Sequence, residues 1–338
     1  MDSKISDFLK QHYSQEALNT ITMLVGGGSS RKYYRFWDQN QSYILADSSN
    51  VEENKTFFNY TKTLREITPN IPQIFHISAD FTLYTQTDLG DNTLMDVLQK
   101  DFESSKTHYY QCVKLLAKVQ IEGGKNIDFN QSFSYPKLDK TLILRDLFQF
   151  KFYFLNALGI DFNPGKLIKD FDLFAHQFNQ LAPKGFVFRD FQSRNIMIKD
   201  NQPYFIDYQG GLYGPIFYDF VSLIWQAKAN LPMDFKKELY NFYFDEIKKL
   251  DANAITIDSR TSYEYCVVAR LLQVLGAYGL RGLIEKKSHF IESISFGLDN
   301  FKVIIDYPIL QNYPELKHVI KVLTDDNTLK LINQKIND

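Results

Sequence analysis

Residues 188–195 read FRDFQSRN, and residues 206–208, beyond a short polar turn, read IDY. Asp190 and Asn195 bracket a loop that enters one short β-like run, and Asp207 ends the next run. The polar segment between the two runs is rich in residues that favour turns. The stretch therefore predicts a two-stranded ribbon with three oxygen-bearing side chains at one mouth.

These three side chains suit phosphoryl transfer, in which a protein supplies metal binding and positioning more than covalent chemistry. Asn195 and Asp207 offer the oxygen ligands that Mg²⁺ prefers alongside nucleotide phosphates. Asp190 is then the group that accepts the proton of an attacking hydroxyl. In a purely structural alternative, Asp190 and Asn195 make turn hydrogen bonds and Asp207 caps the following segment.

On the N-terminal side, the pattern changes from short apolar runs to one amphipathic helix and back. This order predicts a small antiparallel sheet lobe with a single helix on the sheet, at residues 1–87. Residues 3–18 read as one or two short helices before it. The expected strands are 21–25, 31–37, 41–46, 73–78 and 81–86, and the expected helix is 50–64.

Residues 93–338 form the expected helical lobe, which is joined to the sheet lobe through a hinge, DLGDN, at 88–92. The polar stretch 122–137 is predicted as a loop, and the ribbon around Asn195 is the β-structured exception. Apolar residues at helical spacing predict the main helices. These are 107–120, 142–158, 166–181, 234–250 and 262–280.

Composition excludes several classes of protein. Apolar residues make up 44 % and charged residues 23 %, which is typical of a globular chain. Lys and Arg number 38 against 40 Asp and Glu, so no overall positive field favours nucleic acid, and none is expected as a partner. Arg270 and Gln273 interrupt the most apolar helix, so no run of roughly 20 apolar residues predicts a membrane span. The N-terminus lacks the pattern of a secretion signal, and a cytoplasmic location is expected.

The cysteines and histidines predict neither disulfides nor zinc. Cys112 and Cys266 cannot form a disulfide framework and are expected to be buried thiols. The six histidines are scattered singly, without the paired spacing of a zinc site. No oligomeric state follows from the sequence.

FRDxxxxN followed by IDY resembles the catalytic and metal-binding loops of the aminoglycoside phosphotransferase and choline kinase family, which is related to protein kinases. The resemblance covers nearly the whole chain. It implies a two-lobed, protein-kinase-like α+β fold, with ATP and Mg²⁺ as cofactors and a small-molecule hydroxyl as acceptor. Five segments more closely resemble bacterial kinases that phosphorylate N-acetylmuramate and N-acetylglucosamine at the anomeric hydroxyl: 192–195, 207–209, 212–215, 218–223 and 270–276.

The chain departs from the family pattern in two places. Phe188 stands where most of these kinases have histidine, and the strand 43–47, YILAD, lacks the lysine that holds nucleotide phosphates. Arg31 and Lys32, just after a glycine turn, are the candidates to replace that lysine. Because side chains alternate along a strand, only one of the two is expected to face the phosphates. A solvated surface charge is the alternative for each.

The glycine turn at 26–30, GGGSS, lacks the P-loop pattern. As a turn between strands it is nevertheless predicted to cover nucleotide phosphates with backbone N–H groups, a plain turn being the alternative. The residues assigned to this cover are Gly27, Gly28, Ser29 and Ser30. By resemblance, Gln86 and Asp88 belong to the hinge whose backbone meets adenine.

Three further charged residues take their expected roles from the resemblance. Glu53 matches an acidic residue of the family but lacks its usual lysine partner. Asp219 is expected to accept hydrogen bonds from the backbone of the catalytic loop. Arg194 is a candidate for contact with a phosphate or an acidic acceptor, with a surface charge as the alternative.

The predicted activity is ATP- and Mg²⁺-dependent phosphorylation of a small hydroxyl compound. The expected acceptor is an amino sugar, N-acetylmuramate or N-acetylglucosamine, at its anomeric hydroxyl. A kinase for choline, an aminoglycoside or another metabolite is an alternative. A pseudokinase-type nucleotide-binding module is another, favoured by the missing lysine and histidine and opposed by the intact Asp190, Asn195 and Asp207.

Overall fold

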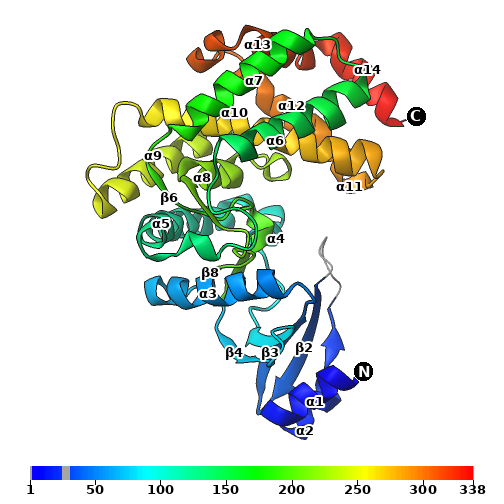
Figure 1. The fold of residues 1–338 in the computed structure, drawn as a ribbon, viewed down its shortest axis with the longest axis vertical. Coiled ribbons are helices and arrows are strands. Elements are labelled where there is room, and N and C mark those ends of the chain that lie inside the picture. The colour runs from blue at the N-terminus through cyan, green and yellow to red at the C-terminus, as the bar shows by residue number, and fades with distance from the viewer. Residues whose placement is uncertain (1, 25–30, 338) are drawn as a thin grey trace. The chain divides into compact units, whose positions relative to one another are not determined.

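The computed structural model describes residues 2–24 and 31–337. Contacts within the chain divide it into two compact units (Figure 1). The first unit consists of Met1–Pro136 and Ser193–Leu212, and the second of Lys137–Gln192 and Tyr213–Asp338. The predicted boundary between lobes at 88–92 stays a prediction. The compact units defined by contacts are a different division of the chain. This division assigns the first helices of the predicted helical lobe, and the ribbon, to the first unit.

The first unit is built on the predicted antiparallel sheet, which has five strands in the order β1-β2-β3-β5-β4. A two-residue turn, Gln39-Asn40, joins β2 to β3, and both residues have positive φ, at 49° and 64°. Such turns match the twist of the strands that they join. The strands are β1 (Thr22–Met23), β2 (Lys32–Asp38), β3 (Gln41–Asp47), β4 (Ile74–Ile77) and β5 (Leu83–Thr87).

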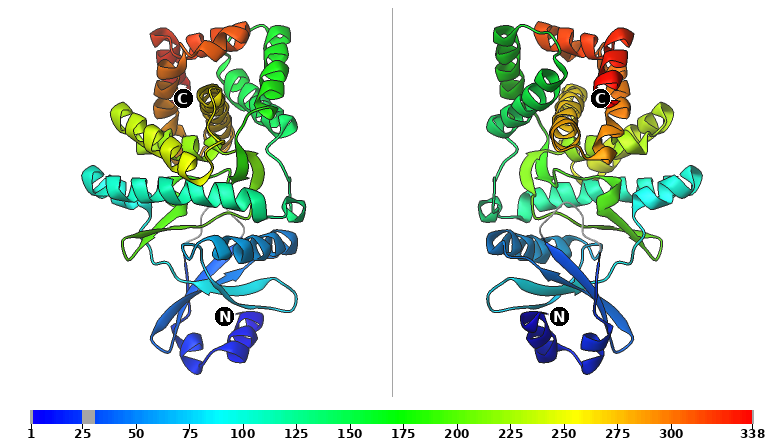
Figure 2. Two further views of the ribbon diagram at one scale, coloured as in Figure 1. Left: turned by 90° about the vertical axis from the view of Figure 1, so that its left-hand side faces the viewer. Right: turned by 90° about the vertical axis from the view of Figure 1, so that its right-hand side faces the viewer.

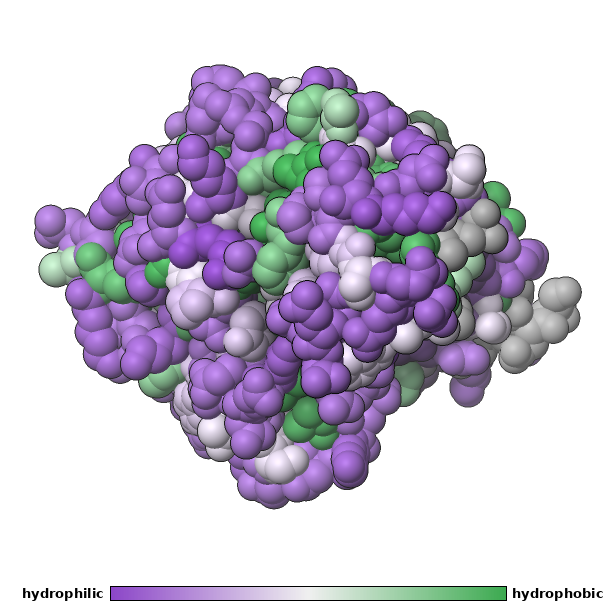
Figure 3. All heavy atoms as spheres, turned by 90° about the horizontal axis from the view of Figure 1, so that it is seen from below, coloured by the Kyte–Doolittle hydropathy of each residue, from purple (hydrophilic) through white to green (hydrophobic). Residues whose placement is uncertain are grey.

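Helices cover both faces of this sheet (Figure 2). On one face, α1 (Ser3–His12) and α2 (Gln15–Thr20) bury an apolar cluster against the strands, with Phe8 and Leu9 packed on Phe36, Leu45 and Leu83 among others. On the other face, α3 (Val51–Ile67) packs Phe57 and Phe58 on Tyr84. The view in Figure 3 shows a mostly hydrophilic surface with small, scattered apolar patches.

The predicted ribbon is present as β7 (Ile196–Lys199) and β8 (Gln202–Phe205), and it is tied to the first unit. The Ile198 N–H donates to the Asn92 carbonyl at 2.8 Å, and the Phe205 N–H to the Asn70 carbonyl at 3.1 Å. Beside the ribbon lie α4 (Leu94–Lys100) and α5 (Phe102–Asn126), followed by the turn η1 (Phe129–Gln131). Because α5 buries Gly123 and continues to Asn126, the loop predicted from residue 122 starts too early.

The second unit is mostly helical, as predicted, with one small two-stranded sheet that the sequence did not predict. That sheet pairs β6 (Lys184–Val187) with β9 (Leu212–Pro215). The helices and turns are α6 (Lys140–Gln149), η2 (Phe150–Asn156), α7 (Pro164–Asn179), α8 (Phe217–Ile224), η4 (Ala227–Ala229), α9 (Met233–Leu250), α10 (Ser259–Tyr278), η5 (Gly279–Ile284), α11 (Ser288–Ile291), α12 (Ser293–Ile304), η6 (Pro308–Asn312), α13 (Pro314–Leu323) and α14 (Asp326–Asn337).

The core helix of the second unit is α10, which packs against α6, α8, η2 and α12. Together with η5 it forms one helical stretch, Ser259–Ile284, that is long and apolar enough to cross a membrane by length and composition. The sequence prediction had counted Arg270 and Gln273 as interruptions. Burial explains the apolar character, because 56 % of an apolar 18-residue window of this stretch lies inside the protein.

Glycines let α10 and η5 approach the π-helical turn η2 at backbone distance. A Cβ atom added at Gly276 would lie 2.8 Å from the Phe150 nitrogen, and one added at Gly279 would lie 2.3 Å from the Tyr153 carbonyl oxygen. Both contacts are with backbone atoms, which cannot rotate away as a side chain can. The register of α10 in the second unit therefore depends on the absence of these two side chains.

We expect Gly279→Ala to destabilise the protein by about 1–3 kcal/mol, the usual cost of overpacking a close-packed interface. Gly165→Ala is the matched control, since its new Cβ would have only the Asn163 Oδ1 atom within 4 Å, at 3.7 Å. Alanine also favours the helix α7 by about 1 kcal/mol over glycine. Thermal unfolding followed by circular dichroism compares the two variants. Equal melting temperatures would contradict the close approach.

Candidate active site

The ribbon brings together two of the predicted site residues in the first unit. Asn195 ends the short turn η3 (Ser193–Asn195) before β7, and Asp207 follows β8. The Asn195 Nδ2 donates to Asp207 Oδ2 at 3.3 Å, and the Gln209 Nε2 donates to Asp207 Oδ1 at 2.7 Å. The two candidate metal ligands therefore lie side by side at one mouth of the ribbon, as the sequence predicted.

Asp207 has a backbone conformation that side chains rarely adopt, with φ at 62°. The next residue, Tyr208, fixes this conformation through its contacts with α3. Tyr208 is buried, stacks on Phe57 with ring centroids 5.0 Å apart, and shares a hydrogen bond of 2.7 Å with the Thr61 hydroxyl. The Thr61 hydroxyl donates to the Phe57 carbonyl, so Tyr208 is the donor in that pair. Burial raises the pKa of Tyr208, which keeps its hydroxyl protonated.

Arg31 occupies the face of the sheet that α3 covers. In the register of β2 and β3, Tyr33 lies opposite Ala46, so Arg31, two residues before Tyr33, shares their face. Its guanidinium contacts Glu53 Oε1 at 3.1 Å and Asn54 Oδ1 at 3.3 Å, both on α3. Arg31 therefore supplies the cationic partner that Glu53 lacks on the third strand.

Lys32 points the other way. It is exposed, and in the β2–β3 register it lies opposite Asp47, on the face away from Arg31. The alternation predicted from the sequence is thus present, and which of the two residues faces the nucleotide phosphates stays a prediction. Only 5 % of the Arg31 side chain is exposed, and a charge so buried requires a partner.

The remaining nucleotide-site predictions have mixed outcomes. Gly27, Gly28, Ser29 and Ser30 lie outside the described residues. Gln86 lies on β5, and its buried Oε1 has no hydrogen-bond partner among the described residues. The Asp88 carboxylate is held by Arg35 at 2.7 Å, and its carbonyl accepts from the Lys199 Nζ at 2.8 Å. Those contacts fix the 88–92 segment to β2 and β7, and contact of Gln86 and Asp88 with adenine stays a prediction.

Asp190 lies in the second unit, at the start of a tightly held loop. Its side chain is 39 % exposed, and its Oδ1 accepts from Arg270 at 3.3 Å and from Gln192. The fully buried Asp219 accepts from the backbone N–H groups of Phe188 at 2.6 Å and Arg189 at 2.9 Å. This is the supporting role expected for Asp219.

Arg189 is the second strained residue of these loops, with φ at 74°. Its guanidinium contacts both oxygens of Asp146 on α6 at 3.0 Å. Phe188 is buried with its ring 4.9 Å from those of Phe186 and Phe191, so it takes the packing role expected where the family has histidine. Nothing in the sequence signalled Asp146, which lies 43 residues before Arg189.

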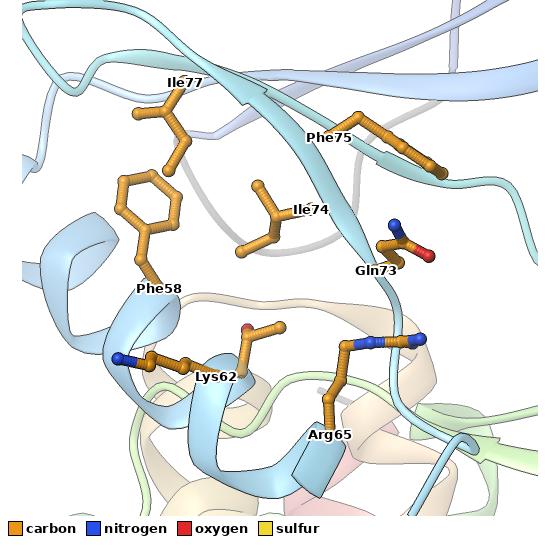
Figure 4. Close-up of a pocket in the computed structure, with 8 residues that line it drawn as sticks. Phe58, Lys62, Arg65, Gln73, Ile74, Phe75 and Ile77 are labelled. Carbon is orange, nitrogen blue, oxygen red and sulfur yellow. The ribbon is translucent and has the colours of Figure 1, made fainter.

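A pocket among the described residues lies elsewhere in the first unit. It measures about 470 Å³, lies between α3 and β4 in the first unit, and has none of the predicted site residues in its lining (Figure 4). Phe58, Ile74, Phe75 and Ile77 form apolar walls, and Lys62 and Arg65 extend from α3. The Arg65 guanidinium donates to the Ile71 carbonyl at 2.6 Å, which accounts for that cation.

The profile of the phosphotransferase enzyme family matches residues 20–252, more than half of the chain. The chain belongs to this family. It is 24 % identical over 287 residues to the N-acetylmuramate/N-acetylglucosamine kinase of Neisseria meningitidis, covering 81 % of this chain and 82 % of that kinase. The family prediction is confirmed, and the protein is a small-molecule kinase of a family whose kinases use ATP.

Solved structures confirm the predicted fold class. The choline kinase LicA of Streptococcus pneumoniae has a TM-score of 0.56 at 10 % identity, over 88 % of this chain and 99 % of that one. The spectinomycin phosphotransferase APH(9)-Ia, solved with ADP and spectinomycin, has a TM-score of 0.56 at 13 % identity, over 99 % of this chain and 98 % of that one. At such identities the likeness shows the fold alone.

We expect Arg31→Gln to raise the KM for ATP by about tenfold or more (about 1.4 kcal/mol is tenfold). The reason is that it removes a buried cation, paired with Glu53 on α3, that is a candidate to hold the nucleotide phosphates. Lys32→Gln removes the same charge from the adjacent residue on the opposite face and should leave the KM for ATP near the wild-type value. Steady-state kinetics with varied ATP compare the two. Equal effects of the two variants would contradict the assignment of Arg31.

Proposed function

We propose that this kinase transfers the γ-phosphoryl group of ATP to the anomeric hydroxyl of an amino sugar, N-acetylmuramate or N-acetylglucosamine. The observation that carries the proposal is the match to the Neisseria meningitidis kinase of that name, which spans about four-fifths of both chains. A match of that extent includes residues of both compact units rather than one shared motif.

Asp190 is the proposed acceptor of the hydroxyl proton. Its carboxylate is partly exposed, whereas the groups that hold its loop, Asp219 and Arg270, are buried. A carboxylate held in this way can orient a hydroxyl and take up its proton as the oxygen attacks phosphorus. An anomeric hydroxyl is more acidic than an ordinary alcohol, which lowers the demand on the base.

Asn195 and Asp207 are the proposed Mg²⁺ ligands. They are adjacent, and a half-turn of the Asn195 amide exchanges its nitrogen and oxygen, so that two oxygens face the same point. Oxygen donors of this kind fit Mg²⁺, which keeps its other positions for phosphates and water. When bound, the ion would neutralise charge on the nucleotide phosphates. Arg31 would add a cation on the face of the sheet beneath α3.

Choline and aminoglycosides are the alternative acceptors. Proteins of similar fold include a choline kinase and a spectinomycin phosphotransferase. The 15 % aromatic content would also allow an aromatic-walled site for a quaternary ammonium. We expect a cytoplasmic enzyme, where ATP is available.

The acceptor is tested by incubating the enzyme with ATP, Mg²⁺ and each candidate: N-acetylmuramate, N-acetylglucosamine, choline and an aminoglycoside. We expect a sugar 1-phosphate, identified by mass and ³¹P NMR and hydrolysed by mild acid. The methyl glycoside of N-acetylglucosamine is the matched control, since it keeps the 6-hydroxyl but has no free anomeric hydroxyl, and it should give no product.

Asp190→Asn should lower kcat for the accepted sugar by about 10²–10⁴-fold, the usual contribution of a general base, while ATP affinity is retained.

In the acceptor test, phosphorylation of the methyl glycoside would show that the enzyme phosphorylates a hydroxyl other than the anomeric one. Activity on choline or the aminoglycoside alone would replace the proposed acceptor.

The metal proposal predicts that Asp207→Ala abolishes Mg²⁺-dependent binding of an ATP analogue and that Asn195→Ala weakens it. Both side chains are proposed ligands, and the carboxylate carries the charge. Calorimetry with Mg²⁺ and with EDTA measures the difference. Gln209→Ala is the control, because it removes a hydrogen bond to Asp207 and no ligand. Equal analogue affinity with and without Mg²⁺ in the wild type would refute the site.

A further inference from the structure

Arg270 is a buried cation whose guanidinium ends at Asp190. It lies on α10, and only 6 % of its side chain is exposed. One terminal nitrogen contacts Asp190 Oδ1 at 3.3 Å, and the other donates to Gln273 Oε1 at 2.7 Å. The carbon of the guanidinium lies 5.9 Å from the centre of the Tyr218 ring. Three neighbours therefore fix the plane that meets Asp190.

The nearby charges of the second unit are directed to other partners. Arg189 contacts Asp146 on α6, and the Asp219 carboxylate on α8 accepts two backbone N–H groups. Arg145, also on α6, contacts Asp146 as well, at 2.8 Å. Arg270 is thus the charge that α10 contributes to the Asp190 carboxylate, while the charges from α6 and α8 brace the loop behind it.

The guanidinium keeps its charge in this position. Burial by itself would lower the pKa of Arg270, but Tyr218 and Asp190 raise it above its ordinary value. Burial raises the pKa of Tyr218, so its ring remains a neutral surface beneath the cation. This position suits arginine, because its planar guanidinium donates several hydrogen bonds in fixed directions, whereas the lysine ammonium is a point charge.

The position of Arg270 depends on the close approach of its own helix. Gly276 lies six residues further along α10, and a Cβ atom added there would lie only 2.8 Å from the Phe150 nitrogen. That contact leaves α10 little freedom to slide or rotate against η2. The position of the guanidinium is consequently fixed both by the packing of α10 and by the contacts of the guanidinium itself.

We propose that Arg270 is a positioning residue that orients the Asp190 carboxylate and keeps it ionised. The inference rests on the proposed role of Asp190 as proton acceptor. In the transfer, the hydroxyl oxygen bonds to the γ-phosphorus, its proton passes to Asp190, and the bond from phosphorus to the β–γ bridging oxygen breaks to release ADP. Arg270 forms and breaks no covalent bond.

This role carries a cost in basicity that points to the acceptor. An arginine within about 4–6 Å stabilises a carboxylate and makes it a weaker base by about 1–3 pKa units. A weakened base suits a hydroxyl that is itself acidic, as the anomeric hydroxyl is. The pairing of Arg270 with Asp190 therefore favours an anomeric hydroxyl over an ordinary alcohol.

The test compares Arg270→Gln, Arg270→Lys and a control, Arg281→Gln. Arg281 lies on η5, is 46 % exposed and pairs with Glu285. For Arg270→Gln we expect the acid limb of the pH profile of kcat/KM to move up by about 1–3 units. We expect kcat to fall with the KM for ATP unchanged. Arg270→Lys should restore the acid limb but not all of kcat, and Arg281→Gln should match the wild type.

A second measurement separates this inference from the identity of the acceptor. Carboxyl ¹³C titration of aspartate-labelled enzyme, without any acceptor, follows Asp190 directly, with its signal assigned by its loss in Asp190→Asn. We expect the titration midpoint of Asp190 to rise in Arg270→Gln and not in Arg281→Gln. If no sugar is phosphorylated but this rise is seen, the acceptor proposal fails and the pairing stands.

An unchanged midpoint and pH profile in a folded Arg270→Gln would overturn the proposal, as would a failure of Arg270→Lys to restore the acid limb. Thermal unfolding establishes that each variant is folded. If Arg270→Gln does not fold, Gln273→Met provides the decision. It removes one anchor of the guanidinium and leaves the charge, so kcat should fall while the acid limb stays. A wild-type kcat in Gln273→Met would then reject a positioning role.

Discussion

A single fully buried carboxylate, Asp219, holds the loop that leads into Asp190 in its conformation. An unpaired charge in that position would be strongly destabilising, so Asp219 requires the two backbone N–H groups that it accepts from Phe188 and Arg189. In return it fixes the backbone of Arg189 in a left-handed conformation that arginine rarely adopts. In that conformation the Arg189 side chain contacts Asp146. The side chain of the next residue, Asp190, contacts Arg270.

In the first unit, α3 carries a comparable share of the constraints. Its N-terminal turn provides Glu53 and Asn54 to the guanidinium of Arg31. Further along the helix, the Thr61 hydroxyl accepts a hydrogen bond from the Tyr208 hydroxyl, and this bond holds the segment that carries Asp207. Arg31, just before β2, and Asp207, after β8, are the groups proposed to bind the nucleotide and its metal ion, and α3 holds both. Displacement of α3 would disturb them together.

The sequence predicted what local pattern and known motifs encode. Alternation placed Arg31 and Lys32 on opposite faces of β2, and the ribbon at Asn195 and Asp207 was found because turn residues and apolar runs mark it. Long-range pairs had no such signal. Arg270 meets Asp190 across 80 residues, and only the packing of α10 brings them together. The strand Leu212–Pro215 was missed because it is short and includes a glycine and a proline, both poor in strands.

The place of Arg31 also bears on which position supplies the cation for Glu53. Position 31, just before β2, and position 46 on β3 share one face of the sheet, so a cation at either can extend toward the same carboxylate on α3. A chain with an arginine at position 31 therefore keeps a cationic partner for Glu53 without a lysine on β3. The ion pair with Glu53 is thus defined by a location in space, which a cation on either side of the β2–β3 pair could occupy.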